Sequence, residues 1–108
     1  MAQAETAIVS RVREFLRRLN QICPIETGVL FGSCTTGRRG KDSDIDLAIF
    51  SREANERNRL ALTALFLKES AYLKLDIQPL VFPYEDYISE NNEFVTTEIK
   101  NKGILVLG

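Results

Sequence analysis

Residues 28–50 of the chain read GVLFGSCTTGRRGKDSDIDLAIF. The short apolar run Val29–Phe31, bounded by glycines, has the length and composition of a buried strand. Residues 45–50 place apolar side chains at every second position, which is the period of a strand with two different faces. Residues 33–44 between them are rich in Gly, Ser, Thr, Arg and Lys, so we expect a loop that joins two strands.

The remainder of the chain alternates helical and extended patterns. No repeat and no Pro/Gly-rich linker divides it, so we expect one α/β domain over residues 1–108, with helices covering a sheet. Pro79 lies inside an extended segment and requires either an edge strand or a non-bonded ladder position, because proline donates no ladder hydrogen bond. The expected elements are helices over 4–20, 54–72 and 84–101, the last broken near Asn91 and Asn92 and capped by Gly103, and strands over 74–82 and 104–107.

The composition narrows the possible chemistry. The 108 residues include 14 Lys and Arg against 15 Asp and Glu, so the composition predicts no general attraction to nucleic acid or anionic membranes. The absence of histidine excludes His-based catalytic triads and most zinc sites. The apolar runs are far shorter than the roughly 20 residues that span a bilayer, and the start is polar, so we expect a cytoplasmic protein in which Cys23 and Cys34 are free thiols.

Asp44 and Asp46 are the first candidates for chemistry. In a strand, residues i and i+2 stand on one face with their Cα atoms roughly 7 Å apart, so both carboxylates can converge on shared cations. Without a cation, two adjacent carboxylates repel each other. Mg²⁺ favours one or two carboxylates together with phosphate oxygens, and a two-metal site holds its ions about 3.5–4 Å apart during phosphoryl displacement. An Asp-x-Asp pair at a strand start is also common as two solvated turn residues, so it needs support from its surroundings.

That support comes from the preceding turn. Gly32 allows a sharp backbone turn and close approach of a phosphate, and Ser33 offers a hydroxyl and an amide. Arg38, Arg39 and Lys41 add positive charge, although a solvated basic loop would have the same composition. The segment therefore predicts an anion site beside a cation site.

The pattern Gly32-Ser33, ten residues, Asp44-x-Asp46, with an apolar strand on each side, resembles the signature of the DNA polymerase beta nucleotidyltransferase superfamily. Within it the chain is most similar to the minimal nucleotidyltransferases, which are often encoded beside a HEPN-domain partner. The resemblance covers nearly the whole chain and implies a palm-like α/β domain with a mixed sheet flanked by helices.

The resemblance also implies roles for residues. Asp44 and Asp46 would hold two Mg²⁺ ions, and Gly32 and Ser33 would hold the phosphates of ATP. A third acid, Asp76, would touch a metal and act as general base from inside a strand antiparallel to the Asp-x-Asp strand. Many relatives carry an arginine in the middle of the Gly-Ser loop, whereas this chain has Cys34-Thr35-Thr36 before Gly37, so we expect the triphosphate contact to shift to Arg38 or Arg39.

The same resemblance predicts an activity and a partner. The chain would transfer AMP from ATP to a hydroxyl, a tyrosine of a HEPN-domain toxin, and so act as an antitoxin. Two alternatives remain at this point: a non-catalytic antitoxin that neutralises its toxin by complex formation, and a small-molecule nucleotidyltransferase. Because the chain has no room for an acceptor domain, we expect a homo- or hetero-oligomer, with Ile104–Leu107 as exposed apolar surface for the partner.

For three further side chains, Cys34, Tyr84 and Tyr87, a structural role is favoured over a functional one. Cys34 lacks a histidine to activate it, so we expect no catalytic role. Tyr84 and Tyr87 are expected to pack or to lie on the surface, with stacking on a nucleobase as the alternative.

Overall fold

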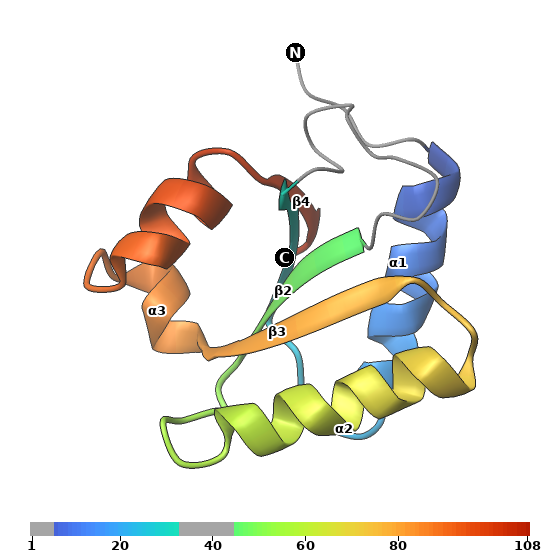
Figure 1. Ribbon diagram of the computed structural model, residues 1–108. Helices are drawn as coiled ribbons and strands as arrows, with labels where there is room; N and C mark the ends of the chain where they lie inside the picture. The colour runs from blue at the N-terminus through green and yellow to red at the C-terminus, as the bar shows by residue number, and fades with distance from the viewer. Residues whose placement is uncertain (1–5, 33–44) are drawn as a thin grey trace.

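The computed structural model describes residues 6–32 and 45–108, and Figure 1 shows their arrangement. Helices lie on both faces of one four-stranded sheet. The chain order is helix α1 (Thr6–Asn20), strands β1 (Thr27–Phe31) and β2 (Ile45–Ser51), helix α2 (Arg59–Tyr72), strand β3 (Ile77–Pro83), the short helix α3 (Tyr84–Ile88), the π-helix η2 (Val95–Lys100) and strand β4 (Ile104–Leu107).

The sheet has the order β3-β2-β1-β4 and is mixed. Strand β1 is antiparallel to β2 and to β4, whereas β2 and β3 are parallel and pair from Ile45↔Ile77 to Ser51↔Pro83. The expectation that β3 is antiparallel to β2 is therefore wrong. The physical reason is the connection: β2 leads through helix α2 to β3, and a helical crossover returns the chain to the same end of the sheet.

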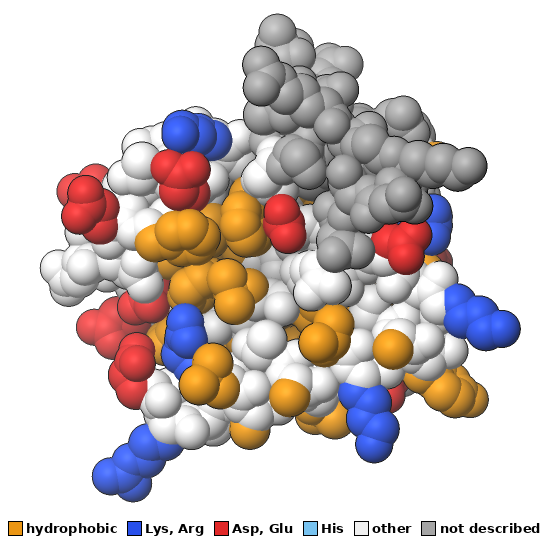
Figure 2. Space-filling model, in the orientation of Figure 1, with side chains coloured by type: hydrophobic (Ala, Val, Ile, Leu, Met, Phe, Trp, Pro, Cys, Tyr) orange, Lys and Arg blue, Asp and Glu red, His pale blue; other side chains and the backbone are white. Residues whose placement is uncertain are grey.

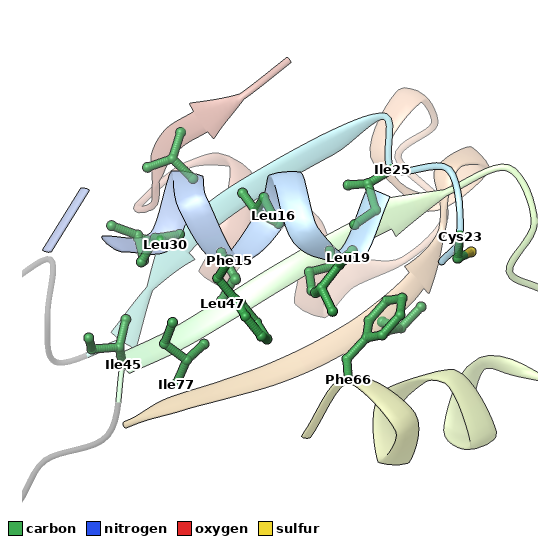
Figure 3. Close-up of a cluster of buried hydrophobic side chains, with 14 of the residues drawn as sticks. Phe15, Leu16, Leu19, Cys23, Ile25, Leu30, Ile45, Leu47, Phe66 and Ile77 are labelled. Atoms are coloured by element: carbon green, nitrogen blue, oxygen red, sulfur yellow. The ribbon is translucent and has the colours of Figure 1, made fainter. Parts of the chain in front are cut away.

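Strand alternation separates two apolar clusters. One face of the sheet packs against α1 and α2, and Figure 3 shows α1 side chains such as Phe15 and Leu19 directed at the strands while Phe66 of α2 reaches the same cluster. The other face packs against η2 through Val95 and Ile99. The alternation predicted for residues 45–50 is confirmed, since Ile45, Leu47 and Ile49 lie in the first cluster and Ala48 and Phe50 in the second.

Several element boundaries follow local signals in the sequence. β3 is an edge strand, one of the two positions that Pro79 allows. Helical structure breaks between α3 and η2, where the Asn92 side chain accepts a hydrogen bond from Val95 N at 3.1 Å. Helix α2 begins five residues later than predicted, because Asn55 and Asn58 form a turn in which each side chain accepts the other's backbone N–H, at 2.7 and 3.0 Å.

Gly103 connects η2 to β4 at a point of close approach. Its N–H donates to Ile99 O at 2.8 Å, which confirms its capping role. A Cβ added at Gly103 would lie against Ile99 O, 2.5 Å from Val29 Cγ1 and 2.7 Å from Leu30 O. Two of these atoms belong to backbone and cannot rotate away.

We therefore expect Gly103→Ala to lower the free energy of unfolding by about 1–3 kcal/mol, the range for overpacked interiors. Urea denaturation measures the change. The matched control is Lys102→Ala, which removes only an exposed pair with Glu98, worth a few tenths of a kcal/mol. Equal stabilities of the two variants would contradict the packing role assigned to Gly103.

Candidate functional site

The turn after β1 and the start of β2 meet at Gly32 and Asp46. Gly32 has φ +76°, a left-handed conformation that residues with a Cβ adopt at a cost. A Cβ at Gly32 would collide with Asp46 Oδ2 and lie 3.2 Å from Asp46 Cγ. The β1–β2 register explains the contact, because Phe31 is the direct partner of Asp46 and Gly32 follows it. The structure therefore brings the predicted phosphate turn against one of the predicted metal-binding carboxylates.

Asp46 lies on the sheet face that carries η2. Its cross-strand partners are Phe31 on β1 and Gln78 on β3, and directly paired residues point to the same face. Asp46 is half-buried, and Gln78 is exposed. The carboxylate is thus anchored in a strand while remaining accessible to solvent.

Asp76 lies beside the start of β2, although not inside a strand as predicted. It is exposed and immediately precedes Ile77, the register partner of Ile45. Its carbonyl accepts a hydrogen bond from Ile45 N at 2.7 Å, which ties its backbone to β2. The parallel direction of β3 explains this placement, since both strands begin at the same end of the sheet.

Ser70 holds the segment around Asp76 from the helix side, and the sequence analysis missed it. Its buried hydroxyl lies 3.0 Å from Leu75 O and 2.9 Å from Ile77 O, the carbonyls on either side of Asp76. The available signal was a serine four residues after Phe66, on the buried face of α2, because a buried hydroxyl needs a partner. The backbone of Asp76 is therefore held from α2 and from β2.

The other predicted site residues lie outside the described residues: Ser33, Arg38, Arg39 and Asp44, together with Cys34 and Lys41. Within 6–32 and 45–108, no three His, Cys, Asp or Glu side chains are grouped so as to hold a metal ion. The Asp46 carboxylate beside Gly32 is a hard oxygen ligand of the kind that Mg²⁺ prefers. Cys23 is a free, buried thiol, as predicted.

Tyr84 and Tyr87 lie far along the sheet from Asp46. Tyr84 follows Pro83, whose partner is Ser51 at the opposite end of β2. The rings of the two tyrosines stack with centroids 6.1 Å apart, and Tyr87 also packs on Phe50 at 5.0 Å. The packing interpretation of both tyrosines is therefore favoured over contact with a nucleotide at Gly32.

Two surface pockets in the described part of the chain lie away from Gly32 and Asp46. One of about 330 Å³ runs between α1 and β4, lined by residues such as Arg13, Leu16 and Val106. Another of about 370 Å³ lies between α1 and the turn after α2. Neither pocket is lined by Gly32 or Asp46, so neither belongs to the candidate site. None of the helices in the described part of the chain has the length and apolar character needed to cross a membrane.

The chain belongs to the family described as nucleotidyltransferase domain, whose family model matches residues 9–106. This match includes the segments that the resemblance had singled out, from the first helix to the last strand. No curated protein matches the chain.

Solved structures share the fold at low sequence identity. A toxin–antitoxin crystallised with AMP-PNP matches with a TM-score of 0.61 and 20% identity, over 93% of this chain and 73% of that one. A mutant of the MntA–HpeT toxin–antitoxin matches with a TM-score of 0.57 and 17% identity, over 93% and 72%. The complex of tri-AMPylated Shewanella oneidensis HEPN toxin with its MNT antitoxin matches with a TM-score of 0.52 and 17% identity, over 93% and 69%.

Proposed function

We propose that this chain is a Mg²⁺-dependent adenylyltransferase that moves AMP from ATP to a tyrosine hydroxyl of a HEPN-domain toxin and so acts as its antitoxin. The observation that carries the proposal is the contact between Gly32 and Asp46, in a chain whose family model covers residues 9–106. A phosphate-binding turn and a metal-binding carboxylate in contact are what nucleotidyl transfer requires. The proposal includes a cytoplasmic location, where ATP and Mg²⁺ are available together.

In the proposed reaction the acceptor oxygen attacks the α-phosphorus of ATP. The bond from the α-phosphorus to the bridging oxygen breaks, and pyrophosphate leaves. Asp76 takes the proton of the attacking hydroxyl, while Gly32 and Ser33 hold the β- and γ-phosphates, with Arg38 or Arg39 as the basic contact. Asp44 and Asp46 would hold two Mg²⁺ ions, which supply charge stabilisation for the pentacovalent phosphorus.

The solved neighbours support this choice of donor and acceptor. One contains an ATP analogue, and another contains a HEPN toxin that has been AMPylated. In the MntA–HpeT mutant, two aspartates two positions apart are replaced by glutamate. Asp44 and Asp46 have the same spacing, which favours the metal-binding role proposed for them.

The edge strand β4 is the proposed contact for the partner. Leu105 and Leu107 are 50% and 36% exposed, as expected for an apolar segment available to another protein. An edge strand also has unpaired backbone groups along one side. A partner on this edge would complete the cleft that a small domain cannot close alone.

The experiment that tests the proposal is incubation of the chain with labelled ATP, Mg²⁺ and the product of the neighbouring gene, which the proposal expects to be a HEPN-domain toxin. We expect the toxin to gain one or more AMP groups on tyrosine, detected by mass spectrometry. Toxin that is neutralised without any gain in mass would instead support the non-catalytic antitoxin. Label appearing only on an added aminoglycoside would support the small-molecule transferase.

Asp76→Asn tests the general base separately from nucleotide binding. We expect the transfer rate to fall by about 10²–10⁴-fold, the usual contribution of a positioned base, while ATP affinity changes little. Asparagine keeps the volume and preserves the backbone hydrogen bond from Ile45 N to the carbonyl of residue 76. A variant that transfers AMP as fast as the parent would remove Asp76 from the mechanism.

A further inference from the structure

Phe94 is an aromatic side chain that belongs to neither apolar cluster of the described residues. It immediately precedes η2 and is 45% exposed, whereas Phe50 and Phe82 on the same sheet face are buried. Its ring meets Phe31 edge-to-face, with centroids 6.0 Å apart, and lies 6.3 Å from the ring of Phe82. These two neighbours fix the orientation of the ring and leave part of it open to solvent.

The same ring lies close to the proposed phosphate turn. Phe31, which Phe94 contacts, is the direct cross-strand partner of Asp46, and directly opposed residues have Cβ atoms about 4.5–5.5 Å apart. Gly32 follows Phe31 in the chain. One cross-strand step and one ring contact therefore separate Phe94 from the carboxylate.

The surface between them is apolar. Figure 2 shows hydrophobic side chains gathered on this face, next to an acidic side chain that borders the grey residues. The half-buried side chains of Phe31 and Leu80 belong to the cluster on this face of the sheet. An apolar surface that adjoins Gly32 and the Asp46 carboxylate, where Mg²⁺ and the phosphates are proposed to bind, matches a ligand with a planar apolar end and a phosphate end.

The helix that Phe94 begins is also unusual. Residues Val95–Lys100 form a π-helix, in which Asn101 N donates to Thr96 O at 3.1 Å, five residues back. Wide turns of this kind have poorer backbone geometry and occur often at functional sites. A local irregularity therefore accompanies the exposed ring.

We propose that Phe94 forms the stacking platform for the nucleobase of the nucleoside triphosphate whose phosphates bind at Gly32. This inference rests on the proposed function and adds the subsite for the base. The ribose spans the gap between the Asp46 carboxylate and the ring. Stacking on a benzyl ring accepts any base, so Phe94 contributes affinity without choosing between adenine and guanine.

Phe94 fits this role better than the tyrosines considered from the sequence. Tyr84 and Tyr87 lie at the opposite end of β2, and their rings are engaged by each other and by Arg52 and Lys100. A protein side chain could also cover Phe94. A nucleobase is favoured because a nucleotide held by its phosphates at Gly32 is already tethered within reach of the ring.

The test compares ligands with and without a base. Calorimetry with Mg²⁺ gives the affinities of the parent and of Phe94→Ala for ATP, GTP and inorganic tripolyphosphate. We expect Phe94→Ala to weaken ATP and GTP by about 5- to 100-fold each, the range for loss of one stacking contact, and to leave tripolyphosphate unchanged. The matched control is Ile88→Ala on α3, which removes an apolar side chain that is 61% exposed, away from the site.

A second variant keeps the test independent of folding. The chain contains three tyrosines and no tryptophan, so Phe94→Trp introduces a single tryptophan that can be excited selectively and that retains a stacking surface. We expect ATP to quench its emission at concentrations near the parent's dissociation constant, while tripolyphosphate does not. Urea denaturation of both variants verifies that they are folded.

The remaining outcomes of these measurements contradict the inference, and each points to a different role for Phe94. Unchanged ATP affinity in Phe94→Ala removes the platform, and an equal loss for ATP and tripolyphosphate assigns the effect to the phosphate turn. Loss of affinity for the HEPN-domain protein with unchanged ATP affinity assigns the ring to the partner. If the parent binds neither ATP nor tripolyphosphate, the proposed function fails, and the base subsite fails with it.

Discussion

We expect Asp46→Asn to abolish AMP transfer while the sheet remains folded. In the proposed mechanism the substitution removes a charged oxygen ligand of the metal at the point where Asp46 meets the Gly32 turn, and it changes the side-chain volume very little. Charge stabilisation by bound metal is worth several kcal/mol in phosphoryl transfer, so we expect a loss of at least about a thousandfold in rate. Transfer to the HEPN-domain protein with labelled ATP measures the rate, and Mn²⁺ binding measures the loss of the ligand.

The matched control for this variant is Glu56→Gln. It makes the same change in charge at an exposed position in the turn before α2. We expect parental rates and parental Mn²⁺ affinity, because one surface charge far from the site is screened by salt. A rate for Asp46→Asn equal to that of this control would place the metal site elsewhere in the chain.

We expect Gly32→Ala to have the second-largest effect on the rate of AMP transfer. The substitution changes no charge and acts only by a steric collision and an unfavourable φ. The new Cβ would lie where Asp46 Oδ2 is now, and it would have to adopt φ +76°. The left-handed conformation costs roughly 1–2 kcal/mol for a residue with a Cβ. Relief of the collision moves the carboxylate or the turn, and a displacement of about 1 Å at an active site can cost a hundredfold in rate.

We therefore expect Gly32→Ala to transfer AMP about a hundredfold more slowly and to bind ATP more weakly. The control is Gly28→Ala in β1, the strand that precedes Gly32. Gly28 has no positive φ, and its added Cβ would meet the end of the Leu16 side chain at 2.7 Å. That variant should lose stability in urea and keep its transfer rate per folded molecule. Parental activity in folded Gly32→Ala would refute the close contact as a requirement of the site.

The Gly32→Ala variant also separates catalysis from binding in cells. If AMP transfer neutralises the toxin, a hundredfold slower transfer should leave the toxin active. If complex formation neutralises it, the toxin should stay inactive, because the proposed partner contact is β4, which lies on the other side of β1 from β2. Growth with the toxin therefore distinguishes the adenylyltransferase from the non-catalytic antitoxin.

Local sequence determined those features that depend on neighbouring residues. The alternation of residues 45–50 predicted which side chains of β2 face each cluster, because adjacent strand residues point to opposite faces. Pro79 predicted an edge strand or a non-bonded ladder position through its missing donor, and the Asn91 and Asn92 pair predicted the break between α3 and η2. The pairing of Gly32 with an Asp-x-Asp strand also predicted the contact that the structure shows.

Only the tertiary structure decided how distant segments meet. The direction of β3 depends on the crossover through α2, so Asp76 lies at the start of a parallel strand instead of inside an antiparallel one. Phe94 and Phe31 are far apart in the chain, and their contact follows from the packing of η2 on the sheet. Periodicity reports which face of an element is apolar, but it carries no information about which other element covers that face. For this reason the candidate carboxylates could be named from the sequence, whereas the aromatic ring of Phe94 beside Phe31 could not.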